Sequence, residues 1–385
     1  MLASLLDIPF DRAAQPFYAR VHDRLRAVAG GAAGVATAVD RATAALAADA
    51  PLADADAEAA FREIIAGGIP DEHVGALLLL LRPERLPPAT IAAFARVVRE
   101  VGVHVTPRLA PDAALLDTCG TGSDGAGTFN VSTTVMFVLA AAGVRVAKHG
   151  NRAITSRCGS ADVLEALGVR TELSPDAVAR CIETVGVGFM LAPAFHPALG
   201  GVQRIRRALT AEVPPALHAR TVFNVLGPLA NPAGARRQLV GVYAAALTGK
   251  LAHVLALLGA ERALVVFGGG LDELTTTGET LVAELRDGRV RERRVTPEEA
   301  GLARVADPGV FAGGDAAENA RVLEAILAGE AGPRADLVAL NAAAGLLLAD
   351  RAATLGEGVV VARALLASGA AARKLEELRR TTQLA

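Results

Sequence analysis

The sequence changes its pattern near residue 110, and this change constrains the fold more than any other feature. Before it, apolar residues recur at helical spacing, as in Phe17, Val21, Leu25 and Val28. After it, short apolar runs alternate with glycine-rich turns and amphipathic stretches. This alternation is typical of an α/β domain with a largely parallel sheet. We therefore expect a helical domain packed on an α/β domain.

Local signals set the expected boundaries. In the first part, Gly30-Gly31 ends one helix, Asp54 caps the next, Pro70 opens another, and Pro87-Pro88 opens one that ends near Val103. In the second part we expect strands at 113–117, 144–148, 188–191, 238–243 and 263–267, helices at 132–143 and from Ser174-Pro175, and further helices from Ala316. The expected domains are an N-terminal helical extension (1–35), a helical domain (36–110, joined by part of a later helical segment) and an α/β domain with C-terminal helices (111–385).

Composition excludes several classes of protein. The formal net charge of -2 lacks the basic excess of a general nucleic-acid binder. The longest apolar runs, such as Val135 to Val144, fall far short of the roughly 20 residues that a membrane span needs. Cys119, Cys158 and Cys181 have no metal-ligand spacing, which favours reduced thiols. We expect a cytoplasmic protein with no membrane or nucleic-acid partner.

A glycine-rich string runs from Asp117 to Gly125, between an expected strand and an expected helix. Its backbone N–H groups can surround an anion. The segment from Asn130 to Thr133 follows at the start of the helix, where free N–H groups favour phosphate. The spacing matches neither the Walker nor the Rossmann pattern, so those nucleotide-binding readings fail.

Two further polar segments follow expected strands. The second expected strand ends in the segment Lys148 to Arg152, and strand ends in open α/β sheets are where ligands bind. Asp272 and Glu273 come after the strand ending at Phe267. Adjacent carboxylates can hold Mg²⁺, which binds few protein oxygens and takes its other ligands from water and substrate phosphate.

A later helix carries Arg204, Arg206 and Arg207, and an arginine can bind a substrate carboxylate through two hydrogen bonds. The sequence has no Gly-x-Ser-x-Gly nucleophile elbow and no His-Glu-x-x-His motif. These features together suit metal-assisted transfer from a polyphosphorylated donor, with no covalent enzyme intermediate.

As a set, these strings resemble the anthranilate phosphoribosyltransferase family, in order and in spacing, from about Ala44 to the C-terminus. The matching strings are 117–124, 130–133, 148–152, 223–232 and 270–273. The resemblance implies a helical domain packed on an α/β domain, as in the nucleoside phosphorylase and phosphoribosyltransferase folds. It also implies a homodimer formed through the helical domains, Mg²⁺ as cofactor, and anthranilate and phosphoribosyl pyrophosphate as substrates of tryptophan synthesis.

The resemblance also implies roles for individual residues. Those expected to hold the pyrophosphate and ribose phosphate are Gly120, Ser123, Asp124, Thr128, Asn130, Val131, Ser132, Thr133, Lys148, His149, Gly150, Asn151, Arg152, Ala153, Ile154, Thr155, Ser156 and Ser160. Gly120, Asn151 and Arg206 would contact anthranilate, with Arg206 facing its carboxylate. Ser132, Asp272 and Glu273 would hold Mg²⁺. Lys148 would stabilise the leaving pyrophosphate, and His149 is a candidate proton acceptor.

The sequence departs from the family pattern in two places, and two alternative functions are compatible with the fold. Ser123 replaces a usual glycine, and the segment Thr210 to Arg220 is longer than usual. One alternative is a pyrimidine nucleoside phosphorylase of the same fold, which would not need the acidic pair. The other is a non-catalytic relative that binds nucleic acid, which the slightly acidic net charge disfavours.

Overall fold

The computed structural model describes residues 2–31, 36–110, 113–122, 124–153, 157–214 and 220–384. Contacts divide the chain into two compact units, one formed by Met1–Gly102 with His196–Leu226 and the other by Val103–Phe195 with Gly227–Ala385.

The first unit is helical. Its helices are α1 (Leu2–Leu6), α2 (Pro16–Ala29), α3 (Ala38–Ala47), α4 (Asp54–Ala66), α5 (Asp71–Leu80), α6 (Pro88–Val101) and α11 (Gly200–Glu212), and α12 (Phe223–Leu229) begins in it. Proline stands in the first turn of α2 and α6, where its missing N–H costs nothing. The prediction that Asp54 caps α4 is wrong, because Ala53 is the cap residue and Asp54 lies in the first turn, near the positive end of the helix dipole.

The N-terminal extension packs as part of this unit. Phe17, Val21 and Leu25 are buried, whereas Val28 is partly exposed. Helix α2 contacts α3, α5 and α11. The Glu212 carboxylate accepts a hydrogen bond of 2.6 Å from the backbone N–H of Phe17, so a residue of α11 satisfies the start of α2. The apolar face predicted from the periodicity is therefore covered within the same unit.

The second unit is an α/β domain. Its strands are β1 (Leu115–Gly120), β2 (Arg145–Gly150), β3 (Val187–Leu191), β4 (Arg237–Gly241), β5 (Arg262–Phe267), β6 (Thr280–Arg286) and β7 (Arg289–Val295). Its helices are α7 (Val131–Ala141), α8 (Ser160–Ala166), α9 (Pro175–Thr184), α10 (Ala192–Phe195), α13 (Thr248–Leu257), α14 (Ala316–Leu327), α15 (Pro333–Leu348), α16 (Leu355–Ala367) and α17 (Ala370–Gln383).

The seven strands form one sheet in the order β3-β2-β1-β4-β5-β6-β7. Strands β3 to β5 in this order are parallel, and β6 and β7 are antiparallel. The largely parallel sheet confirms the predicted fold class. The first expected strand, 113–117, is displaced, because β1 runs from Leu115 to Gly120 and so takes in the start of the glycine-rich string.

The hairpin of β6 and β7 was not predicted. The signal was Asp287-Gly288 between the two strands, since both residues have positive φ, 51° and 71°, as a tight type I′ hairpin turn requires. Strand β7 is mostly charged and exposed, so it lacks the apolar run that marks a buried strand.

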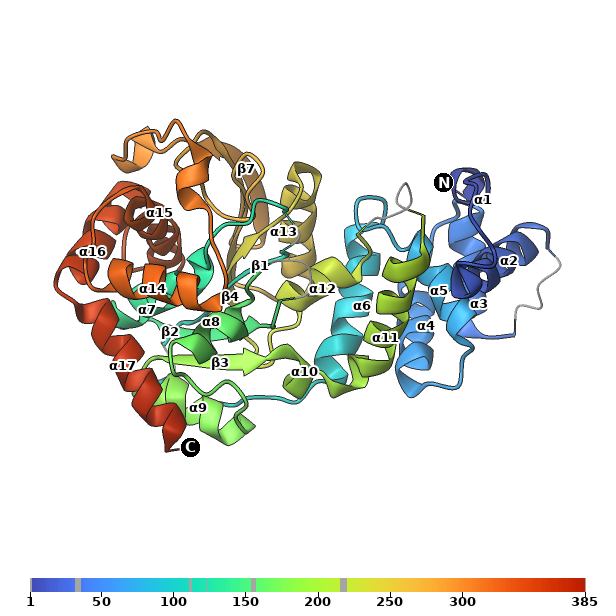
Figure 1. Cartoon of the computed structure of the whole chain (residues 1–385), viewed down its shortest axis with the longest axis horizontal. Coiled ribbons are helices and arrows are strands. Elements are labelled where there is room, and N and C mark those ends of the chain that lie inside the picture. Colours follow the sequence, from blue (N-terminus) through green and yellow to red (C-terminus); the bar gives the residue numbers. More distant parts are fainter. Residues whose placement is uncertain are drawn as a thin grey trace. The chain divides into compact units, whose positions relative to one another are not determined.

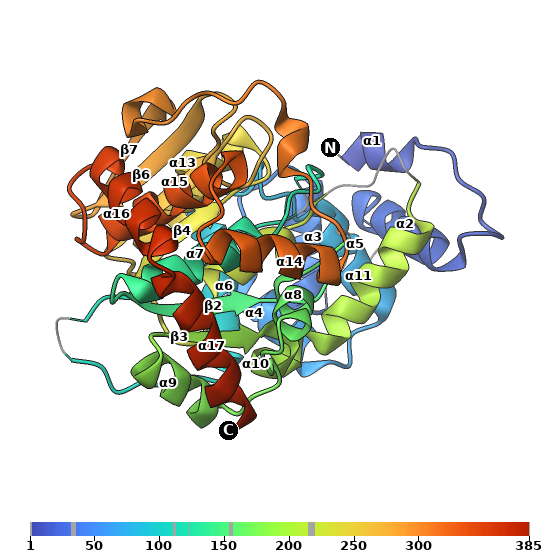
Figure 2. The same cartoon turned by 60° about the vertical axis from the view of Figure 1, so that its left-hand side comes forward.

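Helices cover both faces of the sheet. Helices α14 to α17 all contact α7, and α15 also contacts β1, β4 and β5 (Figure 1 and Figure 2). On β5, Leu264 and Val266 belong to the core beneath these helices, whereas the alternate residues Ala263 and Val265 do not. Helix α13 contacts β5, β6 and β7 and lies on the other side of the sheet (Figure 1).

Within the part of the chain that the structure describes, no single helix is both long and apolar enough to cross a membrane, and only the bent pair Leu355–Ala367 with Ala370–Gln383 meets the length and composition criteria jointly.

Candidate active site

Several predicted site residues of the α/β unit, among them Gly120, Ser132, Asp272 and Glu273, gather near the carboxyl ends of β1 and β4. From β1 the chain continues to β2 and β3 on one side, whereas β4 and β5 lie on the other side of β1. Ligands of open α/β sheets bind in the crevice at such a switch point. Gly120 and Gly241 end the two strands and pair with each other. A Cβ on Gly120 would lie 2.2 Å from Asp272 Oδ2, and one on Gly241 would lie 1.5 Å from the Asp272 carbonyl oxygen. Only glycine at both positions leaves room for the acidic segment.

Asp272 and Glu273 join segments that are far apart in sequence. Asp272 Oδ2 accepts a hydrogen bond from Gly122 N at 2.8 Å, and Glu273 Oε1 accepts one from Ser132 N at 3.1 Å. Asp272 N donates to Asp124 Oδ2 at 3.3 Å. The structure therefore brings together the glycine-rich loop, the start of α7 and the acidic pair.

The carboxylates of this cluster oppose one another. Burial, with a further contribution from Asp124, raises the pKa of Asp272 to about 7. Burial and the neighbouring Asp272 charge raise the pKa of Glu273 well above its usual range. A bound divalent cation would offset this repulsion. Among the described residues no group of three or more His, Cys, Asp or Glu could hold a metal ion. The oxygens of Asp272, Glu273 and Ser132 fit Mg²⁺, which needs few protein ligands.

Lys148 lies beside Ser132. Its side chain is 2% exposed, and its Nζ donates to the Thr118 carbonyl oxygen at 2.6 Å and to Ser132 Oγ at 3.0 Å. Burial lowers the pKa of Lys148, and the charge of Asp117 opposes that shift. Asp117 is fully buried on β1, and burial raises its pKa to about 6. Asp117 was not among the predicted site residues, although it opens the glycine-rich string.

The rest of the Lys148 segment bends toward α8. His149 Nδ1 lies 3.2 Å from the Gly227 carbonyl oxygen. A Cβ on Gly150 would lie 2.2 Å from Ser160 Oγ, and that hydroxyl donates to the Asn151 carbonyl oxygen at 3.3 Å. Gly150, Asn151 and Ser160 therefore lie close together.

Arg152 and Ala153 are engaged with acidic side chains. Arg152 pairs with Glu165 and, at 3.0 Å, with Glu172, so phosphate would compete with these carboxylates for it. Ala153 N donates to Asp162 Oδ2 at 2.8 Å. The predicted residues Ser123, Ile154, Thr155 and Ser156 lie outside the described residues.

The segment before α7 is paired with a distant part of the chain. Thr128 forms an antiparallel bridge with Ala312. Asn130 is the cap residue of α7 but makes no side-chain capping bond, and Val131 and Thr133 are buried in the first turn. The predicted phosphate segment is therefore held from the side of α14.

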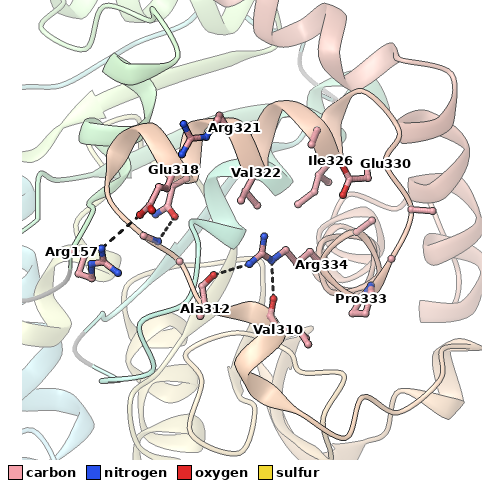
Figure 3. A pocket seen from close by; sticks show the side chains of 17 residues that line it. Arg157, Val310, Ala312, Glu318, Arg321, Val322, Ile326, Glu330, Pro333 and Arg334 are labelled. Atoms are coloured by element: carbon pink, nitrogen blue, oxygen red, sulfur yellow. Dashed lines mark hydrogen bonds and ion pairs between the residues drawn. The ribbon is translucent and has the colours of Figure 1, made fainter.

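A pocket of 620 Å³ lies behind that pairing (Figure 3). No predicted site residue lines it. Arg334 donates from Nε to the Val310 carbonyl oxygen at 2.8 Å and from Nη2 to that of Ala312 at 3.0 Å, and Arg157 pairs with Glu318 at 3.6 Å (Figure 3). Arg334 thus holds the segment that pairs with Thr128.

In the helical unit, Arg206 has only neutral partners among the described residues. Its guanidinium donates to Gln203 Oε1 at 3.0 Å and to Asn224 Oδ1 at 3.4 Å, and lies 5.4 Å from the Phe223 ring centre. Burial lowers its pKa. A partly desolvated guanidinium of this kind is well suited to receive a carboxylate.

The two neighbouring arginines of α11 differ from Arg206. Arg204 forms an exposed ion pair with Asp71, in which its Nη2 donates at 3.0 Å. Arg207 is exposed. Of the three arginines, Arg206 combines burial with uncharged surroundings.

The chain matches two family models. The α/β domain of the glycosyl transferase family matches residues 112–372, and the helical bundle domain of that family matches residues 41–102. The anthranilate phosphoribosyltransferase of Rubrobacter xylanophilus is 50% identical over 88% of this chain and 95% of its own length, and that of Methanocorpusculum labreanum is 46% identical over 84% and 92%.

Solved structures agree. Anthranilate phosphoribosyltransferase from Thermus thermophilus superposes with a TM-score of 0.81 at 42% identity, over 90% of this chain and 99% of that one. The enzyme from Saccharomyces cerevisiae, solved in complex with PRPP and Mg, superposes with a TM-score of 0.78 at 29% identity, over 90% and 98%. With this similarity extending over both units, the chain belongs to the anthranilate phosphoribosyltransferase family.

Proposed function

We propose that this chain transfers the phosphoribosyl group of 5-phosphoribosyl 1-pyrophosphate to anthranilate in tryptophan biosynthesis. The bond between ribose C1 and the pyrophosphate oxygen breaks, a bond from C1 to the anthranilate nitrogen forms, and the amine loses a proton. The observation that carries this proposal is the convergence of Lys148, Ser132 and the Asp272-Glu273 pair at the carboxyl ends of β1 and β4.

Lys148 is proposed to stabilise the charge that develops on the departing pyrophosphate. Two hydrogen bonds fix its ammonium group, and among the described residues they use two of its three N–H donors. The remaining donor can bind a phosphate oxygen. A preorganised charge of this kind, excluded from water, is usually the largest contribution to catalysis.

Ser132, Asp272 and Glu273 are proposed to hold Mg²⁺. When bound there, Mg²⁺ would supply positive charge against the charge of the leaving pyrophosphate. The chain contributes the buried carboxylates and fixes them through Gly122 N and Ser132 N.

The proposed donor-binding set is the one named from the resemblance. It comprises Gly120, Ser123, Asp124, Thr128, Asn130, Val131, Ser132, Thr133, Lys148, His149, Gly150, Asn151, Arg152, Ala153, Ile154, Thr155, Ser156 and Ser160. His149 is proposed as the proton acceptor. If its Nδ1 donates to Gly227 O, its Nε2 is the unprotonated nitrogen of the neutral ring.

Arg206 is proposed to bind the anthranilate carboxylate, with Gly120 and Asn151 also contacting this substrate. Its neutral partners Gln203 and Asn224 support this role. We expect Arg206→Ala to raise the anthranilate KM by about 10- to 150-fold, since charge-assisted bonds contribute about 1.5–3 kcal/mol. The donor KM should change little. Arg207→Ala is the matched control on the same helix, and a selective anthranilate defect in that variant alone would contradict the assignment.

The reaction is tested by following the loss of anthranilate fluorescence. Consumption should require both the pyrophosphate donor and Mg²⁺, and pyrophosphate should be released in equal amount. Phosphorolysis of a pyrimidine nucleoside without anthranilate turnover would instead support the phosphorylase alternative.

We propose that the chain forms a homodimer through its helical units. We also propose a cytoplasmic location with no nucleic-acid or membrane partner. The described residues Cys119, Cys158 and Cys181 are buried thiols, which suits a reducing compartment. Sedimentation velocity would test the dimer, and a single species with the mass of one chain would contradict it.

A further inference from the structure

Two buried asparagines on the C-terminal helices form hydrogen bonds to two parts of the candidate active site. One part is the segment at Asn130, and the other is the backbone that follows Glu273. The first is Asn319 on α14, which is 1% exposed. Its Oδ1 accepts a hydrogen bond from Gly314 N at 2.8 Å, and its Nδ2 donates to Asn130 Oδ1 at 2.9 Å. Asn130 Nδ2 in turn donates to the Cys158 carbonyl oxygen at 3.4 Å.

This chain of bonds determines which way both amides point. The Gly314 N–H can only donate, so Asn319 must present its oxygen there and its nitrogen to Asn130. Asn130 must then present its oxygen to Asn319, which directs its nitrogen toward Cys158. Asn319 therefore sets the orientation of a residue in the proposed donor-binding segment.

The backbone strengthens this link. Phe129 N donates to Phe311 O at 3.1 Å, and Gly313 N donates to Gly127 O at 2.8 Å. The donor-binding segment 127–130 is thus joined to the residues that lead into α14, and the Asn319 side chain closes that connection at its end.

The second asparagine is Asn341 on α15, which is fully buried. Its Oδ1 accepts from Leu274 N at 2.9 Å, and its Nδ2 donates to Leu274 O at 2.9 Å and to Leu337 O at 3.0 Å. The amide thus pairs with both backbone groups of Leu274, as a neighbouring strand would. Leu274 directly follows Glu273, so Asn341 fixes the backbone that carries the acidic pair.

We infer that Asn319 and Asn341 are positioning residues for separate parts of the reaction, Asn319 for the phosphoribosyl donor through Asn130, and Asn341 for the metal-binding pair through Leu274. Neither asparagine is proposed to touch a substrate. The inference rests on the proposed function, because it assigns the donor to the segment at Asn130 and Mg²⁺ to Asp272 and Glu273.

The test compares Asn319→Ala with Asn341→Ala, each serving as the control for the other. Both variants remove a buried amide from a C-terminal helix of the same unit, so a general loss of stability should affect them alike. In Asn319→Ala the Asn130 amide loses the partner that orients it. We expect the donor KM to rise about tenfold, the effect of one hydrogen bond lost between Asn130 and the donor. The anthranilate KM and the Mg²⁺ concentration for half-maximal rate should stay unchanged.

For Asn341→Ala we expect the reverse selectivity. The Mg²⁺ concentration for half-maximal rate should rise about tenfold, and the donor KM at saturating Mg²⁺ should stay unchanged. Without substrates, the rise in melting temperature on adding Mg²⁺ should be smaller than in the wild type. If Asn341→Ala does not fold, Asn341→Ser takes its place, because a hydroxyl can still bond one buried backbone group and adds no charge.

Two results would overturn the inference: equal shifts of donor KM and Mg²⁺ requirement in both variants, or lower melting temperatures with unchanged kinetics. The assay of the wild-type protein distinguishes a failure of this inference from a failure of the proposed function. If the wild type does not consume anthranilate, the proposed function fails, and calorimetric binding of phosphoribosyl pyrophosphate to the three proteins still shows whether Asn319 selectively controls the donor.

Discussion

The sharpest structural prediction concerns Gly241, the last residue of β4. We expect Gly241→Ala to displace Asp272 and so to disrupt the proposed Mg²⁺ site. Gly241 does not have a positive φ, so an alanine there would cause no backbone strain. The expected effect comes instead from steric overlap of the new Cβ with Asp272. A Cβ there would lie 1.5 Å from the carbonyl oxygen of Asp272, 2.2 Å from its carbonyl carbon and 3.0 Å from its Cα.

The size of the effect follows from these distances. Ordinary contact begins near 3.4 Å, so the Asp272 backbone must retreat by about 2 Å. The atoms in the way belong to the backbone and not to a flexible side chain. We therefore expect the free energy of unfolding to fall by an amount near the upper end of the roughly 1–3 kcal/mol typical of overpacking. A displacement of even 1 Å in a catalytic group can lower the rate about 100-fold. We therefore expect kcat/KM to fall by at least that factor.

Urea unfolding and the anthranilate fluorescence assay, repeated over a range of Mg²⁺ concentrations, measure the two effects. Gly278→Ala is the matched control, because Gly278 lies in the same unit, has no positive φ, and a Cβ there would meet nothing within 4 Å. It should retain near-normal stability and turnover. A Gly241→Ala variant with wild-type kcat/KM at low Mg²⁺ would refute the placement of Asp272 against β4.

Three further outcomes are expected. Asp272→Asn with Glu273→Gln should abolish Mg²⁺-dependent turnover yet unfold at a higher temperature than the wild type at pH 8, because both carboxyl pKa values are raised by folding and the stability they contribute is lost as pH rises; near-normal turnover at low Mg²⁺ would contradict the metal assignment. For Asp117, whose pKa rises from 3.8 to about 6, the free energy of unfolding should fall by about 2 kcal/mol between pH 4 and 6, and Asp117→Asn should remove that fall in pH-dependent urea titrations. Removal of Met1–Gly31 should preserve turnover but lower the melting temperature, since each apolar side chain buried on α2 contributes roughly 1.5–3 kcal/mol, and a folded but inactive truncation would show that the extension shapes the site.

Much of the candidate site could be predicted because it lies in short continuous strings. Gly120 and Lys148 lie near the ends of strands, Asn130 directly precedes a helix, and Asp272 follows a strand. Such positions are recognisable from apolar periodicity and glycine. Their convergence could be anticipated because parallel strands place their carboxyl ends at one edge.

Other residues that support the candidate site could not be predicted from short sequence strings. Asn319 and Asn341 lie within helices, where sequence offers no sign of a partner about 70 or more residues away. Gly241 ends a strand like many other glycines, and only the approach of Asp272 explains it. The hairpin of β6 and β7 was overlooked, although its turn at Asp287 is a local signal.

The sequence by itself determined the fold class, the order of the elements and the chemistry of the loops, because periodicity, turn residues and short polar strings are local properties. The tertiary structure alone decided which carboxylates are buried together, which arginine of α11 has uncharged neighbours, and which helical asparagines hold the site loops. These features depend on distances between segments remote in sequence and on the exclusion of water from them. Burial changes the pKa of Asp272 and the hydrogen-bonding requirements of Asn341 only once the sheet and the C-terminal helices have packed.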